Sequence, residues 1–303
     1  MIIKEKFEQL ITDLQNSICQ EVELLDGKGK FKEDVWTREG GGGGFTRVLA
    51  NGNIFEKAGV NRSAVYGEVT PALAAQLKTK GSHFFATGIS LVIHPLSPMV
   101  PTTHANFRYF ELYDEQKNRI DSWFGGGADL TPYYLSEEDA IHFHKTFKTT
   151  CDQFNKSFYP KFKLQCDDYF NNTHRDNERR GVGGIFYDYM RQTENQNEEF
   201  LFKFSEACGE AFTKAYLPIV ERTKMLPYGE EQILWQELRR GRYVEFNLIH
   251  DRGTIFGLKS NGRTESILMS LPPRVRFDYD DQPKHGSLEE GLIKVLKNPR
   301  EWV

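Results

Sequence analysis

Apolar residues recur at three- and four-residue steps from Phe7 to Leu25, and this spacing predicts an amphipathic helix. Gly27 follows the segment and is typical of a helix end. A short helix is predicted after Thr70, because threonine is a good N-cap and Pro71 suits the first helical turn.

Two longer helices are predicted further along the chain. Ser136 and Asp139 form a capping-box pattern ahead of an apolar-periodic segment. A second long helix is expected over residues 198–220. We expect it to be interrupted near Pro218, because proline lacks the backbone N–H that a helix interior uses.

The middle of the chain has the texture of strands. Residues 87–94 and 106–112 are rich in apolar residues that favour strands, and residues 123–127 predict a third strand that ends in three glycines. The glycine run at 40–44 leads into a strand-like run at 45–49. That context does not fit a phosphate-binding loop, which opens a helix and carries a Lys-Ser/Thr pair.

The last third also reads as strands. We expect three short ones over residues 242–249, 254–258 and 264–271. Turns at 251–253 and at the Asn-Gly pair 261–262 would separate them, and Asn-Gly is a strong hairpin signal. Strands joined by tight turns form antiparallel sheets, so the pattern predicts one α+β domain covering residues 1–303.

Composition narrows the function classes. The chain has 303 residues, with 39 Lys and Arg against 43 Asp and Glu, a net charge of -4 that argues against a general nucleic-acid binder. No apolar run reaches 18 residues, and the first residues lack the apolar stretch of a secretion signal. The four cysteines form no C-x-x-C pair and are expected to be buried apolar residues. A cytoplasmic enzyme is therefore expected.

Aromatic residues and arginines suggest a ligand. Phe and Tyr number 23 and 13, which suits either a wide core or a flat apolar ligand. Arg108 and Arg263 lie in or beside predicted strands rich in apolar residues, where an unpaired guanidinium is costly. Carboxylates of the protein or of a ligand would satisfy them. Together these residues favour a flat apolar molecule edged with carboxylates.

Histidines and aspartates supply the other candidates. His94, His104 and His174 lie in separate segments and His144 lies on the inner stripe of a helix, so the four could meet at a metal ion, although no standard ligand spacing demands it. Each is more typical of a hydrogen-bonded structural histidine. His104 is the best placed general acid or base. Asp129 and Asp251 occupy predicted turns, where aspartate usually bonds its own backbone.

Longer motifs point to one family. They comprise residues 41–49, 90–95, 100–108, 123–132, 174–175, 180–184, 242–247 and 251–273. Examples are Val-Pro-Thr-Thr-His-Ala-Asn-Phe-Arg at 100–108 and Trp-Phe-Gly-Gly-Gly-Ala-Asp-Leu-Thr-Pro at 123–132. With these motifs the chain resembles, nearly end to end, the oxygen-dependent coproporphyrinogen III oxidase family of haem biosynthesis.

The resemblance implies a fold and a reaction. The fold is a large antiparallel β-sheet flanked on both faces by α-helices, and the enzyme is a homodimer formed around residues 243–275. The reaction converts coproporphyrinogen III and O2 to protoporphyrinogen IX, CO2 and H2O2, turning two propionates into vinyl groups. No organic cofactor is implied, although a divalent metal has been attributed to bacterial members.

The resemblance also implies roles for single residues. His104 matches a proton donor, and Asp129 and Asp251 match acids that handle pyrrole N–H protons. The implied substrate-binding positions are Ser90, Asn106, Phe107, Arg108, Arg252, Asn261, Gly262 and Arg263. Asn261 stands where close relatives carry glycine, and asparagine tolerates the same turn geometry. The implied metal ligands are His94, His104, His144 and His174.

These roles give a mechanistic hypothesis. Removing a pyrrole N–H proton, with Asp251 or Asp129 as the base, lets the electron-rich ring react directly with O2, while Arg108, Arg252 and Arg263 bind propionates. Two other classes stay open: a metal hydrolase built on the four histidines, and a tetrapyrrole carrier without catalysis.

Overall fold

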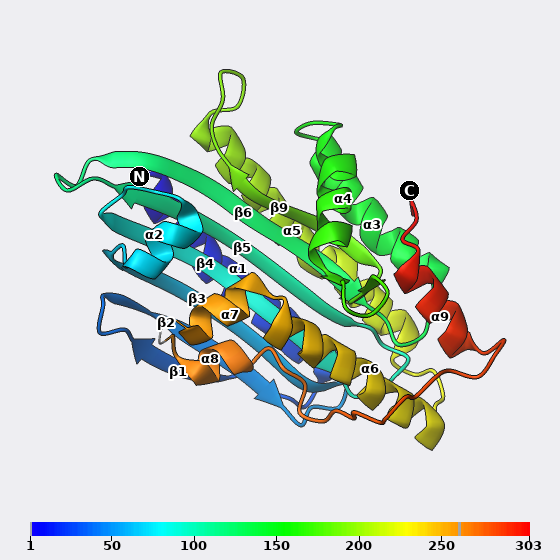
Figure 1. Cartoon of the computed structure of the whole chain (residues 1–303). Helices are drawn as coiled ribbons and strands as arrows, with labels where there is room; N and C mark the ends of the chain where they lie inside the picture. Colours follow the sequence, from blue (N-terminus) through cyan, green and yellow to red (C-terminus); the bar gives the residue numbers. More distant parts are fainter. Residues whose placement is uncertain (1, 260–261) are drawn as a thin grey trace.

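Among the residues described by the computed structural model, 2–259 and 262–303, seven strands form one antiparallel sheet in the order β1-β2-β3-β4-β5-β6-β9 (Figure 1). The strands are β1 (Lys32–Thr37), β2 (Gly42–Ala50), β3 (Phe55–Glu68), β4 (His83–Pro95), β5 (Thr102–Tyr113), β6 (Arg119–Thr131) and β9 (Gly183–Met190). A separate two-stranded ribbon pairs β7 (Asn171–Asn172) with β8 (Glu178–Arg179).

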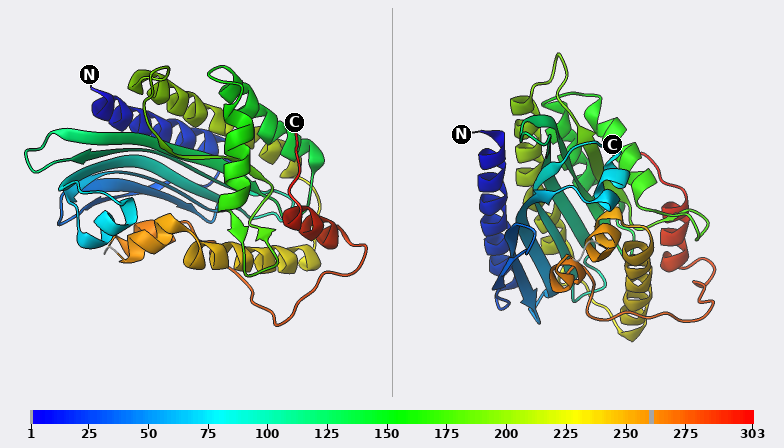
Figure 2. Two further views of the ribbon diagram at one scale, coloured as in Figure 1. Left: turned by 45° about the horizontal axis from the view of Figure 1, so that its top comes forward. Right: turned by 60° about the vertical axis from the view of Figure 1, so that its left-hand side comes forward.

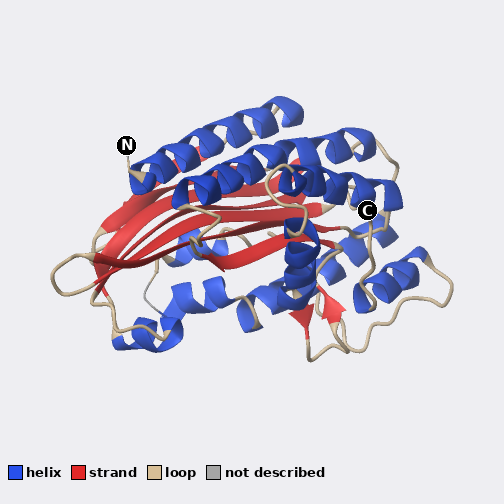
Figure 3. Cartoon of the chain, turned by 90° about the horizontal axis from the view of Figure 1, so that it is seen from above, coloured by secondary structure: helices blue, strands red, loops and turns tan. Residues whose placement is uncertain are grey.

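One face of the sheet is covered by three long helices, α1 (Ile3–Asp26), α3 (Glu137–Asp152) and α5 (Glu198–Thr223) (Figures 2 and 3). The main hydrophobic core lies between them and the sheet and is rich in phenylalanine. Phe7 of α1, for example, contacts the rings of Tyr109, Phe124 and Phe202. Many of the aromatic residues in the composition therefore fill this core.

The opposite face carries α2 (Pro71–Leu77), α6 (Glu230–Ile249), α7 (Arg252–Lys259) and α8 (Thr264–Leu268) (Figure 2). Helix α4 (Phe158–Tyr169) packs beside the edge strand β9, and α9 (Leu288–Lys297) lies near the β7–β8 ribbon. The predicted fold class, an antiparallel sheet with helices on both faces, is confirmed. None of the helices in the described residues is long and apolar enough to cross a membrane.

Several local predictions are also confirmed. Gly27 ends α1 in the left-handed conformation, with φ of 74°. The side chain of Thr70 caps α2, and that of Ser136 caps α3 by accepting from the N–H of Asp139. The strands predicted at 87–94, 106–112 and 123–127 are parts of β4, β5 and β6. All four cysteines are buried free thiols.

The strands predicted in the last third are wrong, because residues 242–249, 254–258 and 264–268 are helical in α6, α7 and α8. Tyr243 and Phe246 suggest a strand by propensity, but they continue a three- and four-residue spacing of buried residues that includes Trp235 and Arg239. The hairpin predicted around 261–262 is also wrong, because the segments before and after it are the helices α7 and α8 and not strands. Asn261 lies outside the described residues, and the N–H of Gly262 bonds the carbonyl of Gly257 in α7.

The interruption predicted near Pro218 is also wrong, because α5 continues to Thr223. Proline at 218 cannot donate to the carbonyl of Lys214, four residues earlier. His142 of the neighbouring α3 bonds that carbonyl through Nε2 at 3.1 Å. A side chain on another helix thus takes the place of the missing donor.

Asp26 fixes the end of α1 to the turn between β2 and β3. Its carboxylate is buried and accepts from the N–H groups of Lys28, Gly29, Asn53, Ile54 and Phe55. Burial raises the pKa of this carboxyl, but the backbone donors outweigh burial and the pKa is lowered.

We predict that Asp26→Ala lowers the free energy of unfolding by about 2–4 kcal/mol, because it leaves several buried N–H groups without an acceptor. A lowered folded-state pKa means that Asp26 stabilises the fold above its unfolded pKa of about 3.9 and loses this effect as pH falls through the folded value. Urea unfolding between neutral and acidic pH measures both. The exposed Asp13→Ala on the same helix is the control, and an equal loss in both variants would contradict the prediction.

Candidate functional site

A cavity of about 430 Å³ lies between the sheet and the helices α6, α7 and α8. Its floor is made by residues of β4, β5 and β6 that face away from the main core. Ser90, Asn106 and Gly127 are direct neighbours across these strands, and all three line the cavity. His104 and Arg108 follow on the same face of β5, because side chains two residues apart share a face.

Phe107 shows the other consequence of this alternation. It points to the opposite face and is fully buried in the main core. Of the predicted substrate-binding residues on β4 and β5, Ser90, Asn106 and Arg108 therefore meet at the cavity, while the ring of Phe107 supports the floor from beneath.

Two arginines of the wall share one carboxylate. Arg108 bonds Asn106 Oδ1 at 2.7 Å and pairs with Asp188 Oδ1 at 3.0 Å. Arg252, at the start of α7, lies 3.6 Å from the other oxygen of Asp188 and over the ring of Tyr169. The wall thus combines cations with aromatic surface, as the sequence suggested for a flat ligand with carboxylates.

Asp129 lies directly behind His104. The register pairs the two residues across β5 and β6, and Asp129 Oδ1 is 2.7 Å from His104 Nδ1. Arg180 Nη2 contacts both oxygens of Asp129 at 2.9 Å, and Arg180 Nη1 donates to Asn247 Oδ1. Asp129 and Arg180 are 1% and 4% exposed, so this is a buried ion pair.

Electrostatics keep this group ionised. Burial raises the pKa of Asp129, but the Arg180 cation and the His104 hydrogen bond outweigh burial and the pKa is lowered. Burial lowers the pKa of Arg180, but the Asp129 carboxylate outweighs burial and the pKa is raised above its usual value, so Arg180 stays a cation. The carboxylate of Asp129 is therefore committed to two partners and orients the His104 ring toward the cavity.

Asp251 faces the cavity from the opposite side. Its Oδ1 accepts from the Tyr169 hydroxyl at 2.8 Å, and its Oδ2 accepts from the N–H of Thr254 at 2.7 Å. The second bond is that of a helix N-cap, here for α7. Asp251 thus bonds local backbone, as aspartates in turns do, and also presents a carboxylate to the site.

Two of the remaining predicted positions, Gly262 and Arg263, are not part of the cavity wall. Arg263 pairs with Asp34 of β1 and donates to Ser266, whose side chain is part of the wall. The N–H of Gly262 bonds the carbonyl of Gly257 in α7, and Asn261 is outside the described residues. The structure thus brings Arg108 and Arg252 together, while Arg263 lies nearer the outer strand β1.

Sequence comparison now decides the family. Residues 6–302 match the family profile described as coproporphyrinogen III oxidase. The chain belongs to the coproporphyrinogen III oxidase family.

Curated relatives match nearly the whole of this chain. The chain is 49% identical over 312 residues to "Coproporphyrinogen-III oxidase 1, chloroplastic" of Arabidopsis thaliana, which covers 99% of this chain and 80% of the relative. It is 50% identical over 311 residues to the "Oxygen-dependent coproporphyrinogen-III oxidase" of Drosophila melanogaster, which covers 99% of this chain and 78% of the relative.

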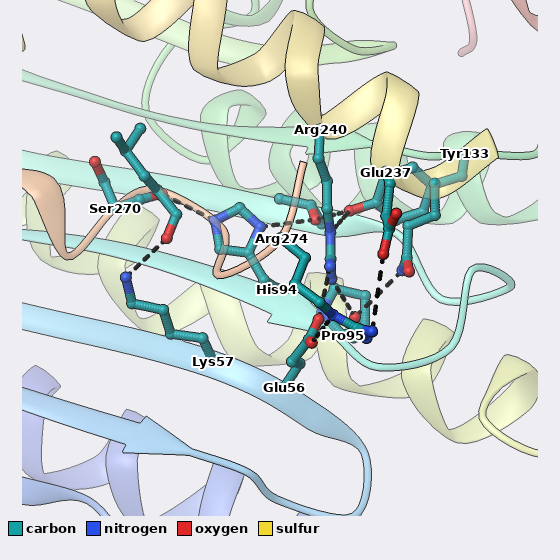
Figure 4. Close-up of polar contacts among 12 residues, drawn as sticks. Glu56, Lys57, His94, Pro95, Tyr133, Glu237, Arg240, Ser270 and Arg274 are labelled. Atoms are coloured by element: carbon teal, nitrogen blue, oxygen red, sulfur yellow. Dashed lines mark hydrogen bonds and ion pairs between the residues drawn. The ribbon is translucent and has the colours of Figure 1, made fainter. Parts of the chain in front are cut away.

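The four histidines predicted as metal ligands of this coproporphyrinogen III oxidase family member do not meet. His94 is buried, with Nδ1 beside Thr102 Oγ1 and Nε2 beside the carbonyl of Ser270 (Figure 4). His144 is fully buried between the Tyr159 hydroxyl and the Val182 carbonyl.

His104 is committed to Asp129, and His174 contacts His250 and Glu245. Burial lowers the pKa of His144 to about 3 and that of His94 well below its usual value, so both are neutral structural residues. Among the described side chains, no three His, Cys, Asp or Glu are grouped to hold a metal ion. The residues present do not fit a shared metal site, and no step below depends on one.

Sequence reasoning assigned no role to several wall residues of this family member. These are Tyr169, Arg180, Asp188, Tyr243 and Asn247. The available signal for Asp188 was an acidic residue inside the otherwise apolar run at 185–190. Arg180 and Tyr243 belong to the family motifs at 180–184 and 242–247, but their position next to Asp129 depends on long-range packing.

We predict that Asp129→Asn lowers the free energy of unfolding by about 3–5 kcal/mol, because it leaves the buried Arg180 cation without its counter-charge. The double variant Asp129→Asn/Arg180→Met removes both charges and should recover part of the loss. Urea unfolding of both variants measures this coupling. Equal or greater loss in the double variant would contradict the interpretation.

Proposed function

We propose that this chain catalyses the oxygen-dependent oxidative decarboxylation of two propionates of coproporphyrinogen III, giving protoporphyrinogen IX. In each step the propionate loses CO2 and a β-hydrogen to become a vinyl group. The two electrons released reduce O2, which takes up the hydrogen and one proton to become H2O2. Family membership supports this activity.

The observation that carries the proposal is the composition of the cavity wall. Arg108 and Arg252 face the same space as the rings of Tyr169 and Phe186. A tetrapyrrole offers apolar ring surface and peripheral carboxylates, so one ligand matches both features. We propose that Arg108 and Arg252 bind propionates, while Ser90 and Asn106 contact the ligand from the floor.

We propose peripheral or indirect roles for the other predicted substrate-binding residues. Gly262 and Arg263, with Asn261, would contact the periphery of the macrocycle after it enters. Phe107 would act through the floor that it supports. A divalent metal and a cytoplasmic location stay predictions from the sequence.

We propose that Asp251 is the carboxylate that takes up the pyrrole N–H proton. It faces the cavity, whereas Asp129 is buried behind His104 with both oxygens bonded to Arg180. Asp129 would instead act as a positioning residue. It fixes His104 through Nδ1, which leaves Nε2 as the ring nitrogen that gives a proton to the reduced oxygen.

The activity is tested by mixing the protein with coproporphyrinogen III without oxygen and then adding a pulse of O2. We expect one CO2 and one H2O2 for each vinyl group formed. Binding without CO2 release would instead indicate a tetrapyrrole carrier. Repeating the pulse after chelation tests a metal-dependent reaction, and loss of all activity would contradict the reaction as written.

We predict that Asp251→Asn lowers kcat by about 10²–10⁴-fold, the usual effect of losing a general base. Asparagine is as good an N-cap as aspartate, so α7 should keep its start and coproporphyrinogen III should still bind. Asp251→Ala removes the cap as well and provides the comparison for structural effects. Near-normal turnover in Asp251→Asn would remove this residue from the mechanism.

We also propose a homodimer formed through residues 243–275. Leu248, Ile249 and Leu258 support it, because these apolar side chains at the end of α6 and in α7 are 45%, 55% and 38% exposed. Neighbouring exposed apolar residues are typical of interaction surfaces.

We predict that Leu248→Asp/Ile249→Asp weakens dimer association at least tenfold, because charges would be buried at the interface. Sedimentation equilibrium measures this. The control is Leu24→Asp, which changes an apolar residue of α1 that is 82% exposed and lies outside the segment. Unchanged association in the double variant would contradict the proposed interface.

A further inference from the structure

Asp188 occupies an unusual position in the cavity wall. It pairs with both Arg108 and Arg252, at 3.0 and 3.6 Å, and it offers one oxygen to each. Its side chain is 20% exposed, so it lies at the boundary between the protein and the cavity. The geometry is that of a carboxylate bound between two guanidinium groups.

The sheet is built to allow this contact. Arg108 lies on β5 and Asp188 on β9, with β6 between them, so the arginine must cross β6. Its neighbour on β6 is Gly125, and a Cβ there would lie 2.7 Å from Arg108 Nε. The glycine therefore leaves the space in which the guanidinium crosses the strand.

The charges of this group are unequal. Arg108 and Arg252 supply two positive charges and Asp188 supplies one negative charge, which leaves an excess of one. The pairs are also partly open to solvent, with side-chain exposures of 33% for Arg108 and 56% for Arg252. Partly exposed ion pairs contribute little net stability, so a second carboxylate can exchange with the first.

We propose that Asp188 is an internal counter-ion that occupies the carboxylate site of Arg108 and Arg252 until a carboxylate of the ligand displaces it. The inference rests on the proposed function, because it assumes that the ligand carries carboxylates. Asp188 competes with the ligand and so weakens its binding. The same competition favours release of a product that still carries carboxylates.

A second role for Asp188 makes the opposite prediction. If it only positioned the two arginines for the ligand, removing its charge would weaken binding. Equilibrium binding of a ligand that cannot react separates the two roles. Coproporphyrin III is a suitable probe, because it has four carboxylates and its aromatic ring is already oxidised.

Fluorescence titration of coproporphyrin III should show that Asp188→Asn binds about two- to fivefold tighter than the wild type, the range expected for losing a partly exposed competing ion pair. The gain should shrink as salt is added, because ions screen exposed charges. Asp188→Glu keeps the competing charge and should bind like the wild type. Asp121→Asn is the matched control, since Asp121 of β6 also pairs with a partly exposed arginine, Arg191, and is not part of the cavity wall.

Equal or weaker binding by Asp188→Asn overturns the inference. A gain of the same size in Asp121→Asn also overturns it, because a general change in net charge would then explain the effect. Failure of the wild type to bind coproporphyrin III contradicts the proposed function itself. The two failures are therefore distinguished by the wild-type titration.

Discussion

The arrangement of the cavity depends on one cation that is almost completely buried. Arg180 lies among the rings of Phe170, Tyr243 and Phe246, with its charge balanced by Asp129. A buried arginine is destabilising unless a counter-charge and hydrogen-bond acceptors lie close to it. Nη1 and Nη2 of Arg180 have such acceptors in Asn247 and Asp129, whereas Nε is buried without one among the described residues. The end of α4, the C-terminal part of α6 and strand β6 therefore meet around this side chain. Their packing fixes Asp129, and through Asp129 the position of His104 at the cavity.

A second cluster keeps α6 in place farther along the sheet. Arg240 of α6 donates to Glu56 at 2.6 Å and to the carbonyl of Pro95 at 2.7 Å, and Arg274 also contacts Glu56 (Figure 4). Lys57 donates to the carbonyl of Leu271. Helix α6 and the segment after α8 are thus tied to the ends of β3 and β4, so the roof and the floor of the cavity are connected by charged contacts.

The sequence predicted local structure well where a short pattern suffices. Strands β4, β5 and β6 and the long helices α1, α3 and α5 follow from alternation, apolar spacing and capping residues. Helix α6 was missed because its aromatic and β-branched residues favour strands, and the spacing that opposes this is visible only over the whole helix. Helices α7 and α8 are short, and residues that favour turns lie beside them. The turn predicted at 251–253, for example, is the start of α7.

The candidate site was predictable to a similar degree. Ser90, His104, Asn106 and Arg108 share one sheet face, so neighbouring strands were enough to bring them together. Phe107 belongs to the same motif, but the period of a strand sends its ring into the core. The pairs Asp129–Arg180 and Arg108–Asp188 join segments about 50 and 80 residues apart. Pairings over such separations depend on tertiary packing, which cannot be inferred from the pattern of a single sequence.

The glycines of β6 have a consequence for ligand size. Gly125 and Gly127 both lie on the cavity side of β6, and Gly127 contributes only backbone to the floor of the cavity. A methyl group at 125 would collide with Arg108, and one at 127 would collide with the carbonyl of Ile185. The absence of side chains at these two positions of β6 therefore sets the depth of the cavity. An uncharged side chain there would restrict the size of the ligands that fit, without any change in the charge of the site.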